Sequence, residues 1–197
     1  MRPSAADFSA LREINPDTVG WIRLFGTPID YPIVQERLGD HYLRHNFSGE
    51  ESRHGSVCLD MNSPMVFPDR RNRLRGHNMS DGSMFRALTG YLEPEFFAAH
   101  PAIEIDTPQG GYTASVWAAI RVPYEEEALS IVPADPLGFE AWRCLIEKRS
   151  RLRGSIRPTF FDQNIVFCTC ETEGADGLAH GDVLVFAVLR PREPGKS

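Results

Sequence analysis

The sequence predicts a mainly β fold with added helices, in which about eight short strands form one mainly antiparallel sheet that can close into a barrel. Three observations favour this fold class. Short apolar runs separated by turn residues recur along most of the chain. The runs follow one another without the strict strand–helix alternation of a doubly wound sheet. The length of 197 residues suits one hydrophobic core better than two.

The elements follow in order from the pattern of apolar residues. Residues 4–14 place Phe8 and Leu11 on one helical face, and Asn15-Pro16-Asp17 ends this helix. We therefore expect a helical appendage at residues 1–17 and a single main domain at residues 18–197. Further helices are expected at 83–91, 94–100 and 135–149, with a helical turn at 41–47. The expected strands are 21–25, 29–34, 56–59, 72–76, 102–106, 112–122, 164–169 and 182–189.

Composition and charge argue against several classes of protein. Acidic residues outnumber basic ones by 27 to 21, and the formal net charge of -6 disfavours a nucleic-acid-binding protein. The chain contains no run of 18 apolar residues and does not open with the pattern of a secretory signal peptide. The four cysteines form no repeated CxxC pair and the aspartates lack EF-hand spacing, so neither zinc nor calcium is predicted.

Two segments combine residue types that can carry out chemistry. In the first, the strand at 72–76 ends at a glycine and His77 follows at once. A sheet edge suits a catalytic imidazole because it fixes the backbone while the ring faces a cleft. In the second, the strand at 164–169 leads into Cys170 and a polar loop. Cys170 lies nearer this loop than Cys168 and is the better candidate for a nucleophilic thiolate. Taken singly, a surface histidine and a buried structural thiol are the simpler interpretations.

Four motifs occur in a fixed order along residues 15–189. They are Asn15-Pro16-Asp17-Thr18-Val19-Gly20-Trp21-Ile22, Ile29-Asp30-Tyr31-Pro32-Ile33-Val34-Gln35, Gly76-His77-Asn78-Met79 with Asp81-Gly82-Ser83-Met84-Phe85, and Thr169-Cys170-Glu171. In this order and at this spacing, the sequence resembles the sortase family, most closely the class B sortases.

The resemblance implies a closed eight-stranded sortase β-barrel with an N-terminal helix and an extra helix, here 135–149, before the cysteine strand. It also implies a cysteine transpeptidase that cuts a C-terminal sorting motif after its threonine and passes the acyl group to an amine on a cell-wall precursor or a pilin. By position, Cys170 would be the nucleophile and His77 the general acid and base, with no metal or other cofactor. The expected location is the extracellular face of the membrane of a Gram-positive bacterium, with any anchor outside this sequence.

One residue that the resemblance implies is missing. Sortases carry an arginine on the strand after the cysteine, where it supports the substrate carbonyl and the developing oxyanion. No arginine occurs between Cys170 and Arg190, and Asp182 takes the expected position, or His180 if the loop shifts by two residues. Arg75 is another source of positive charge, because strand alternation directs it to the same face as His77. A solvent-facing Arg75 is the simpler interpretation, and low or lost activity is a third outcome.

The remaining candidates flank the two main residues. Glu171, Thr169 and Asn78 are expected to bind substrate, and the glutamates at 125–127 are expected in a solvated loop. A disulfide between Cys168 and Cys170 would be strained at a spacing of two strand residues. Two alternatives to a transpeptidase stay open: a catalytically impaired sortase fold that binds a sorting peptide, and a cysteine hydrolase that releases acyl groups to water.

Overall fold

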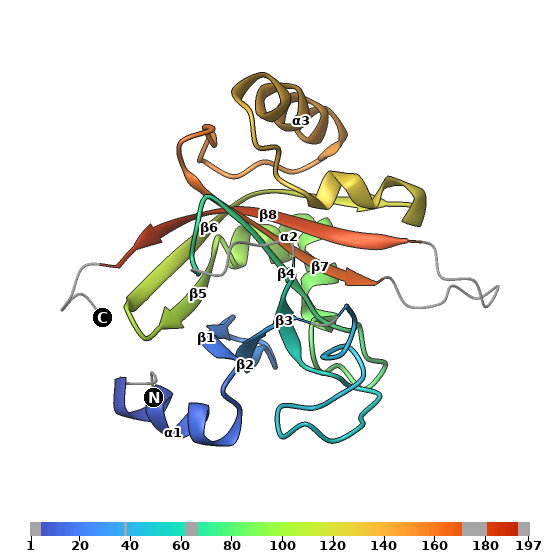
Figure 1. Ribbon diagram of the computed structural model, residues 1–197. Helices are drawn as coiled ribbons and strands as arrows, with labels where there is room; N and C mark the ends of the chain where they lie inside the picture. Colours follow the sequence, from blue (N-terminus) through green and yellow to red (C-terminus); the bar gives the residue numbers. More distant parts are fainter. Residues whose placement is uncertain (1–4, 38, 62–66, 171–180, 193–197) are drawn as a thin grey trace.

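The fold is a closed barrel of eight strands, with helices at its ends and on its outer surface (Figure 1). The computed structural model describes residues 5–37, 39–61, 67–170 and 181–192. The strands are β1 (Thr18–Arg23), β2 (Asp30–Gln35), β3 (Val57–Leu59), β4 (Arg71–Arg75), β5 (Ala102–Thr107), β6 (Gly110–Val122), β7 (Gln163–Cys170) and β8 (Asp182–Pro191). The helices are α1 (Ala5–Ile14), η1 (Arg86–Leu92), α2 (Pro94–Ala99), η2 (Tyr124–Ser130) and α3 (Pro136–Arg149), of which η1 and η2 are 3₁₀ helices.

The strand order around the barrel is β1-β2-β3-β4-β7-β8-β6-β5. Six of the eight pairings in the described part of the chain are antiparallel, and the two parallel ones join β2 to β3 and β4 to β7. The prediction of a closed, mainly antiparallel sheet is therefore confirmed. The parallel pairs were not predicted, because each joins strands that a long connection separates in sequence.

Several boundaries differ from the sequence expectation. Strand β1 begins at Thr18, three residues earlier than predicted, because Gly20 lets the chain pass close to β5: a Cβ at this position would lie 2.9 Å from the carbonyl oxygen of Asp106. The helical turn expected at 41–47 is a single turn, closed by the hydrogen bond from Arg44 N to His41 O. The helix expected at 83–91 is the 3₁₀ helix η1, and η2 was expected as a loop.

Two apolar layers hold the barrel together. The inner layer fills the barrel, and Leu74, Phe167 and Phe85 belong to it. The outer layer lies beneath α3, where Trp142 packs edge to face against Trp117 at 6.0 Å between ring centroids. Helix α3 packs on the outer face of β6, β7 and β8 (Figure 1).

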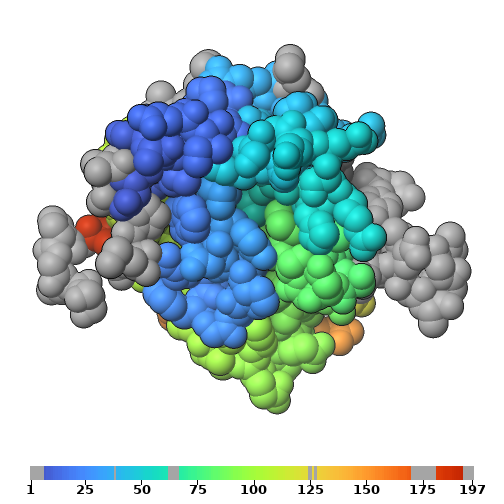
Figure 2. Space-filling view, turned by 90° about the horizontal axis from the view of Figure 1, so that it is seen from below, coloured from blue at the N-terminus to red at the C-terminus, as the bar shows by residue number. Residues whose placement is uncertain are grey.

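The N-terminal helix joins this body through its buried Phe8 and through the residues that follow it. Asn15 donates its side-chain amide hydrogen to the carbonyl oxygen of Phe47 at 2.9 Å. Figure 2 shows α1 in dark blue beside the 41–56 segment in cyan on the same face. The division at residue 17 stays a prediction. None of the helices in the described residues has the length and the apolar run that spanning a bilayer requires.

Candidate active site

The parallel pairing of β4 with β7 brings the two main candidate positions to one edge of the barrel. Arg75 and Cys168 are backbone partners, and the Gly76 amide donates to the Cys168 carbonyl at 3.2 Å. His77 follows Arg75 by two residues, and Cys170 follows Cys168 by two. The backbone positions 77 and 170 therefore continue the same register past the end of β4. The side chain of Cys170, together with Glu171 and His180, lies outside the described residues.

A backbone carbonyl orients the ring of His77. Its Nε2 lies 2.7 Å from the carbonyl oxygen of Leu43. A carbonyl oxygen can only accept, so Nε2 carries a proton, and in the neutral ring Nδ1 holds the lone pair. The backbone of His77 is fixed as well, since its carbonyl accepts from the Phe85 amide at 2.8 Å. The imidazole is thus restrained on one side and keeps one nitrogen for proton exchange.

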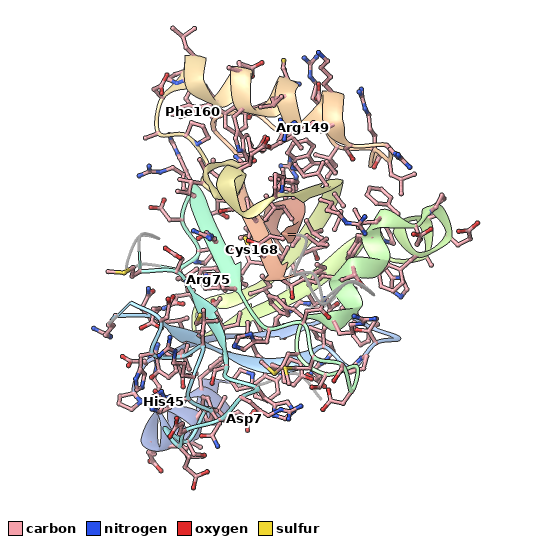
Figure 3. All side chains as sticks on the ribbon, turned by 90° about the vertical axis from the view of Figure 1, so that its right-hand side faces the viewer. Asp7, His45, Arg75, Arg149, Phe160 and Cys168 are labelled. Carbon is pink, nitrogen blue, oxygen red and sulfur yellow. The ribbon has the colours of Figure 1, made fainter. Side chains whose placement is uncertain are left out.

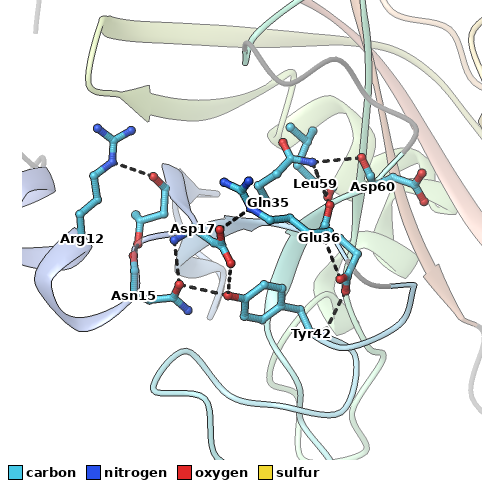
Figure 4. A network of polar contacts seen from close by, with 10 residues as sticks. Arg12, Asn15, Asp17, Gln35, Glu36, Tyr42, Leu59 and Asp60 are labelled. Carbon is cyan, nitrogen blue, oxygen red and sulfur yellow. Dashed lines mark hydrogen bonds and ion pairs between the residues drawn. The ribbon is translucent and has the colours of Figure 1, made fainter.

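Leu43 is held in turn by the polar network around its neighbour Tyr42 (Figure 4). The Tyr42 hydroxyl lies 3.0 Å from both Asn15 Oδ1 and Asp17 Oδ2, and burial raises the pKa of this phenol to about 12. The Tyr42 amide donates to the buried carboxylate of Glu36 at 2.8 Å. The Asn15-Pro16-Asp17 motif therefore positions the segment whose carbonyl orients His77.

The loop after His77 also has a defined shape. The Met84 amide donates to the Tyr31 hydroxyl at 3.0 Å, and Met84 has a positive φ of 55°. The Asp81 carboxylate accepts from the amide and the hydroxyl of Ser83, and these hydrogen bonds hold the pKa of Asp81 well below its ordinary value. The Tyr31–Met84 hydrogen bond thus joins two of the sequence motifs, Ile29–Gln35 and Asp81–Phe85, in the loop that follows His77.

Arg75 is half-buried and already paired. Its Nη1 lies 2.8 Å from the Asp40 carboxylate and 3.8 Å from that of the buried Asp60. Burial lowers the pKa of Arg75, but the hydrogen bond and the charge of Asp40 outweigh it, so the net shift is upward. Asp60 also pairs with Arg73 at 3.5 Å. Arg75 therefore lies beside the site on β4, with its charge shared by two carboxylates.

Asp182 occupies the position opposite the candidate nucleophile. The alpha carbons of Cys170 and Asp182 are cross-strand partners in the β7–β8 pair. The charge of Asp182 also acts on Cys168, whose pKa rises to about 11, chiefly through burial. Cys168 is a buried free thiol under α3. The carboxylate of Asp182 thus stands where the resemblance implies an arginine.

The other candidates differ in their contacts. Thr169 is buried and its hydroxyl has no hydrogen-bond partner among the described residues, whereas Asn78 accepts from the Arg86 guanidinium at 3.2 Å. Their roles in substrate binding stay predictions. Of the glutamates at 125–127, Glu126 forms a bidentate ion pair with the two terminal guanidinium nitrogens of Arg149. Within the described residues, no three His, Cys, Asp or Glu side chains gather as a metal-binding group.

A shallow groove lies along the start of β4, between Asp69 and Arg73, at the end of the strand away from His77. It consists of two hollows of about 40 and 210 Å³ that share Arg71 and Val132. One wall is the basic side of β4, and the other is the apolar 131–134 segment with Phe160. Figure 3 looks onto the edge from this side, with Arg75 beside Cys168 and Phe160 farther along.

Comparison with known proteins identifies close relatives. The chain is 32% identical over 163 residues to sortase B of Listeria monocytogenes and 29% identical over 164 residues to sortase B of Staphylococcus aureus, in each case over 83% of this chain. It spans about two thirds of the length of these relatives, 66% and 67% respectively. No protein-family model matches the chain.

Solved structures agree with the sequence relatives. The sortase B–substrate complex of S. aureus superposes with a TM-score of 0.86 at 26% identity, over 96% of this chain and 87% of that one. Sortase B of B. anthracis in complex with AAEK1 gives 0.82 at 31% identity, over 94% and 85% of the two chains. The barrel, its helices and the order of its strands are thus shared with proteins of one family.

Proposed function

The chain belongs to the class B sortase family, and we propose that it is a cysteine transpeptidase of the Gram-positive cell surface. It cleaves the C-terminal sorting motif of a secreted surface protein after a threonine and transfers the acyl group to an amine on a peptidoglycan precursor or a pilin. The observation that carries this proposal is the parallel β4–β7 register, in which both strands end at one barrel edge with positions 77 and 170 two residues beyond a backbone pair.

The reaction proceeds in two acyl transfers. The thiolate of Cys170 attacks the threonine carbonyl carbon, and the tetrahedral intermediate collapses as the C–N bond breaks and the leaving amine takes a proton from His77. An acceptor amine then loses a proton to His77 and attacks the thioester carbon. The C–S bond breaks, and Cys170 leaves as the thiolate. The first transfer leaves Cys170 acylated and His77 without its proton, and the second restores the thiolate and the protonated His77.

The contact between His77 and Leu43 supports the role of His77 as the proton donor and acceptor. Because the Leu43 carbonyl binds Nε2–H, Nδ1 is the nitrogen that exchanges protons with the two amines. The acyl donor would approach this edge alongside β4, whose last residue, Arg75, is the backbone partner of Cys168.

A second candidate function is supported by Asp182. A carboxylate opposite the nucleophile supplies no hydrogen-bond donor to an oxyanion, and its charge disfavours a thiolate nearby. On this reading the protein binds a sorting peptide at the barrel edge and processes it slowly or not at all. The two candidates differ in whether a thioacyl enzyme forms.

The test is to incubate the protein with a pool of peptides derived from sorting signals and to measure its intact mass. A transpeptidase gains the mass of an acyl group at Cys170, and added amines such as triglycine then release it as an amide product. The exposed Cys144 is the control site, because a Cys144→Ser variant retains the adduct whereas Cys170→Ala loses it. Peptide binding by wild type and Cys170→Ala without any adduct in wild type would instead establish the binding protein.

A further inference from the structure

Arg75 lies on the outer face of the barrel, between two thiols of neighbouring strands. It is the backbone partner of Cys58 on β3 and of Cys168 on β7 (Figure 3). Cross-strand partners share one face of a sheet, and Cys168 belongs to the outer apolar layer, whereas Leu74 belongs to the inner one. Burial raises the pKa of both thiols, and the charge of Arg75 opposes this rise at each. The guanidinium therefore acts on the outer face, beside β7.

The candidate nucleophile occupies the next position of the same face. Position 170 follows Cys168 by two residues on β7, so strand alternation assigns it to the face that carries Arg75. With strands about 4.8 Å apart and a rise of about 3.3 Å per residue, the alpha carbons of positions 75 and 170 are about 8 Å apart. Long side chains reach diagonal neighbours at this separation. The guanidinium of Arg75 can therefore be brought to a group bound at position 170.

The two carboxylates that hold Arg75 do not depend on it. Asp60 has a second partner, since it also pairs with Arg73 at 3.5 Å. The Asp40 side chain is 58% exposed, so water can replace the guanidinium as its partner. Moving Arg75 away from Asp40 therefore leaves no buried charge without a partner. A negative charge that forms at position 170 would compete with Asp40 for the guanidinium.

We propose that Arg75 is the catalytic residue that stabilises the oxyanion of the acyl transfer, and that Asp40 holds its guanidinium back until the oxyanion forms. This inference rests on the proposed function. Asp182 offers a negative charge and no donor on the β8 side, so the carbonyl oxygen is best placed toward β4. When the S–C bond forms, the π electrons of the carbonyl move onto its oxygen, to which two N–H groups of Arg75 donate. When the C–N bond breaks, the C=O double bond is restored and Arg75 returns to Asp40.

The kinetic test measures the rate of thioacyl formation with peptides derived from sorting signals. Arg75→Gln should lower the maximal rate by about 100-fold with little change in KM, the effect of removing one oxyanion donor. Arg75→Lys, which keeps the charge but not the fork of donors, should retain part of the rate. Arg190→Gln breaks a comparable ion pair, with Asp162 at the far end of β8, and as the matched control it should behave as wild type.

The role of Asp40 is tested by a double-mutant cycle with Arg75. Asp40→Asn should raise the rate of thioacyl formation, because the guanidinium is no longer held back. The Asp40→Asn/Arg75→Gln double variant should be as slow as Arg75→Gln alone, since Asp40 acts only through Arg75. An Asp40→Asn variant no faster than wild type would overturn the part of the inference that concerns Asp40.

A second test needs no turnover and uses the same peptides with a C-terminal threonine aldehyde. The thiol of Cys170 adds to the aldehyde carbon, the carbonyl oxygen takes the thiol proton, and the thiohemiacetal oxygen lies where the oxyanion would form. Alkylation of Cys170 by iodoacetamide creates no such oxygen. Arg75→Gln should weaken aldehyde binding, measured by calorimetry, by about tenfold and should change the alkylation rate much less. A variant with a misfolded site would lose both.

The outcomes separate this inference from the proposed function. Aldehyde binding that Arg75→Gln weakens supports the inference even when wild type forms no thioacyl enzyme, in which case only the proposed function fails. Thioacyl formation and aldehyde binding that Arg75→Gln leaves unchanged overturn the inference alone. So does a loss of alkylation as large as the loss of acyl transfer, because Arg75 would then act on the thiolate or on the fold. Neither a thioacyl enzyme nor an aldehyde adduct in wild type would overturn both.

Discussion

At the scale of single residues, the chemistry of the site depends on Asp182. It faces Cys170 across the β7–β8 pair, at a position from which a side chain reaches its cross-strand neighbour. Its charge opposes a thiolate, and it offers no donor to an oxyanion. On the β4 side, the guanidinium of Arg75 is shared between Asp40 and Asp60. From this arrangement we expect the first acyl transfer to be slow.

Replacing Asp182 separates the two effects. Asp182→Asn removes the charge without adding a fork of donors, and Asp182→Arg does both. We expect thioacyl formation to rise modestly in Asp182→Asn and by about 100-fold in Asp182→Arg, the range over which one oxyanion donor acts. Burst-phase kinetics with a thiol-reactive sorting peptide would measure this. A decrease in both variants, at unchanged thermal stability, would show that Asp182 assists the reaction.

Tyr42 gives a second prediction at this scale, because its hydroxyl ties Asn15 and Asp17 to the segment that orients His77. Tyr42→Phe should lower the free energy of unfolding by about 1 kcal/mol, the usual effect of losing a buried hydrogen bond. It should also reduce the rate of acyl transfer, since Leu43 loses its anchor. Tyr112→Phe is the control, because the Tyr112 hydroxyl has no hydrogen-bond partner in the described part of the chain. Identical effects of both substitutions on stability would contradict the role of the network.

The sequence revealed the residue types of the site but not their restraints. Cys170 and His77 were predicted as site residues because the motifs around them are specific, and this assignment stays a prediction. The contact of His77 with the Leu43 carbonyl could not be predicted, because every residue carries a carbonyl and its direction depends on the fold. The Arg75–Asp40 pair was also missed, since 35 residues separate its members and only the closed barrel brings them together.

At the scale of elements, the end of β4 depends on a close contact between Gly76 and Phe85. A Cβ at position 76 would lie 2.9 Å from two carbon atoms of the Phe85 ring. Phe85 is fully buried and packs edge to face on Phe167 of β7. The glycine therefore allows the loop that carries His77 to fold back onto the barrel core.

Gly76→Ala should destabilise the protein by about 1 to 3 kcal/mol through overpacking, and it should displace His77. Urea unfolding gives the stability change. A double-mutant cycle with Phe85→Leu is the control, because a smaller side chain at position 85 relieves the contact and the two effects should then fall short of additive. Strictly additive changes in the free energy of unfolding would show that Gly76→Ala does not act through its contact with Phe85.

The elements also show where prediction from sequence succeeds. The strands were found to within a few residues, since alternating apolar residues mark them directly. Strand pairing was not found, because β4 and β7 are about 90 residues apart and nothing in either sequence encodes their parallel register. Helix α3 was predicted closely, with Asp135 now seen as its N-cap, accepting from the Gly138 amide at 2.8 Å.

At the scale of the whole molecule, the closed sheet buries two thiols in its walls. Burial raises the pKa of Cys58 to about 12 and that of Cys168 to about 11, from an ordinary value of 9.0. A group whose pKa is raised on folding contributes stability below its unfolded pKa and loses it as the pH rises toward the folded value. Both thiols therefore stabilise the fold below about pH 9 relative to more alkaline solution.

We expect the free energy of unfolding to fall between pH 9 and pH 11, as measured by urea denaturation across that range. Cys168→Ala should be less stable at neutral pH. Its free energy of unfolding should fall less steeply with pH, because no thiol at position 168 ionises in the unfolded state. Cys144→Ala, at an exposed site, should keep the wild-type slope. A slope that Cys168→Ala leaves unchanged would assign the alkaline transition to other groups.

The most direct test of the account is the reactivity of Cys170 toward a peptide vinyl sulfone, followed site by site with mass spectrometry. If a thiol at position 170 and an imidazole at position 77 work together at one barrel edge, Cys170 is modified faster than the exposed Cys144, and His77→Ala slows Cys170 alone. Modification of Cys170 no faster than Cys144, at a rate that His77→Ala does not change, would contradict it.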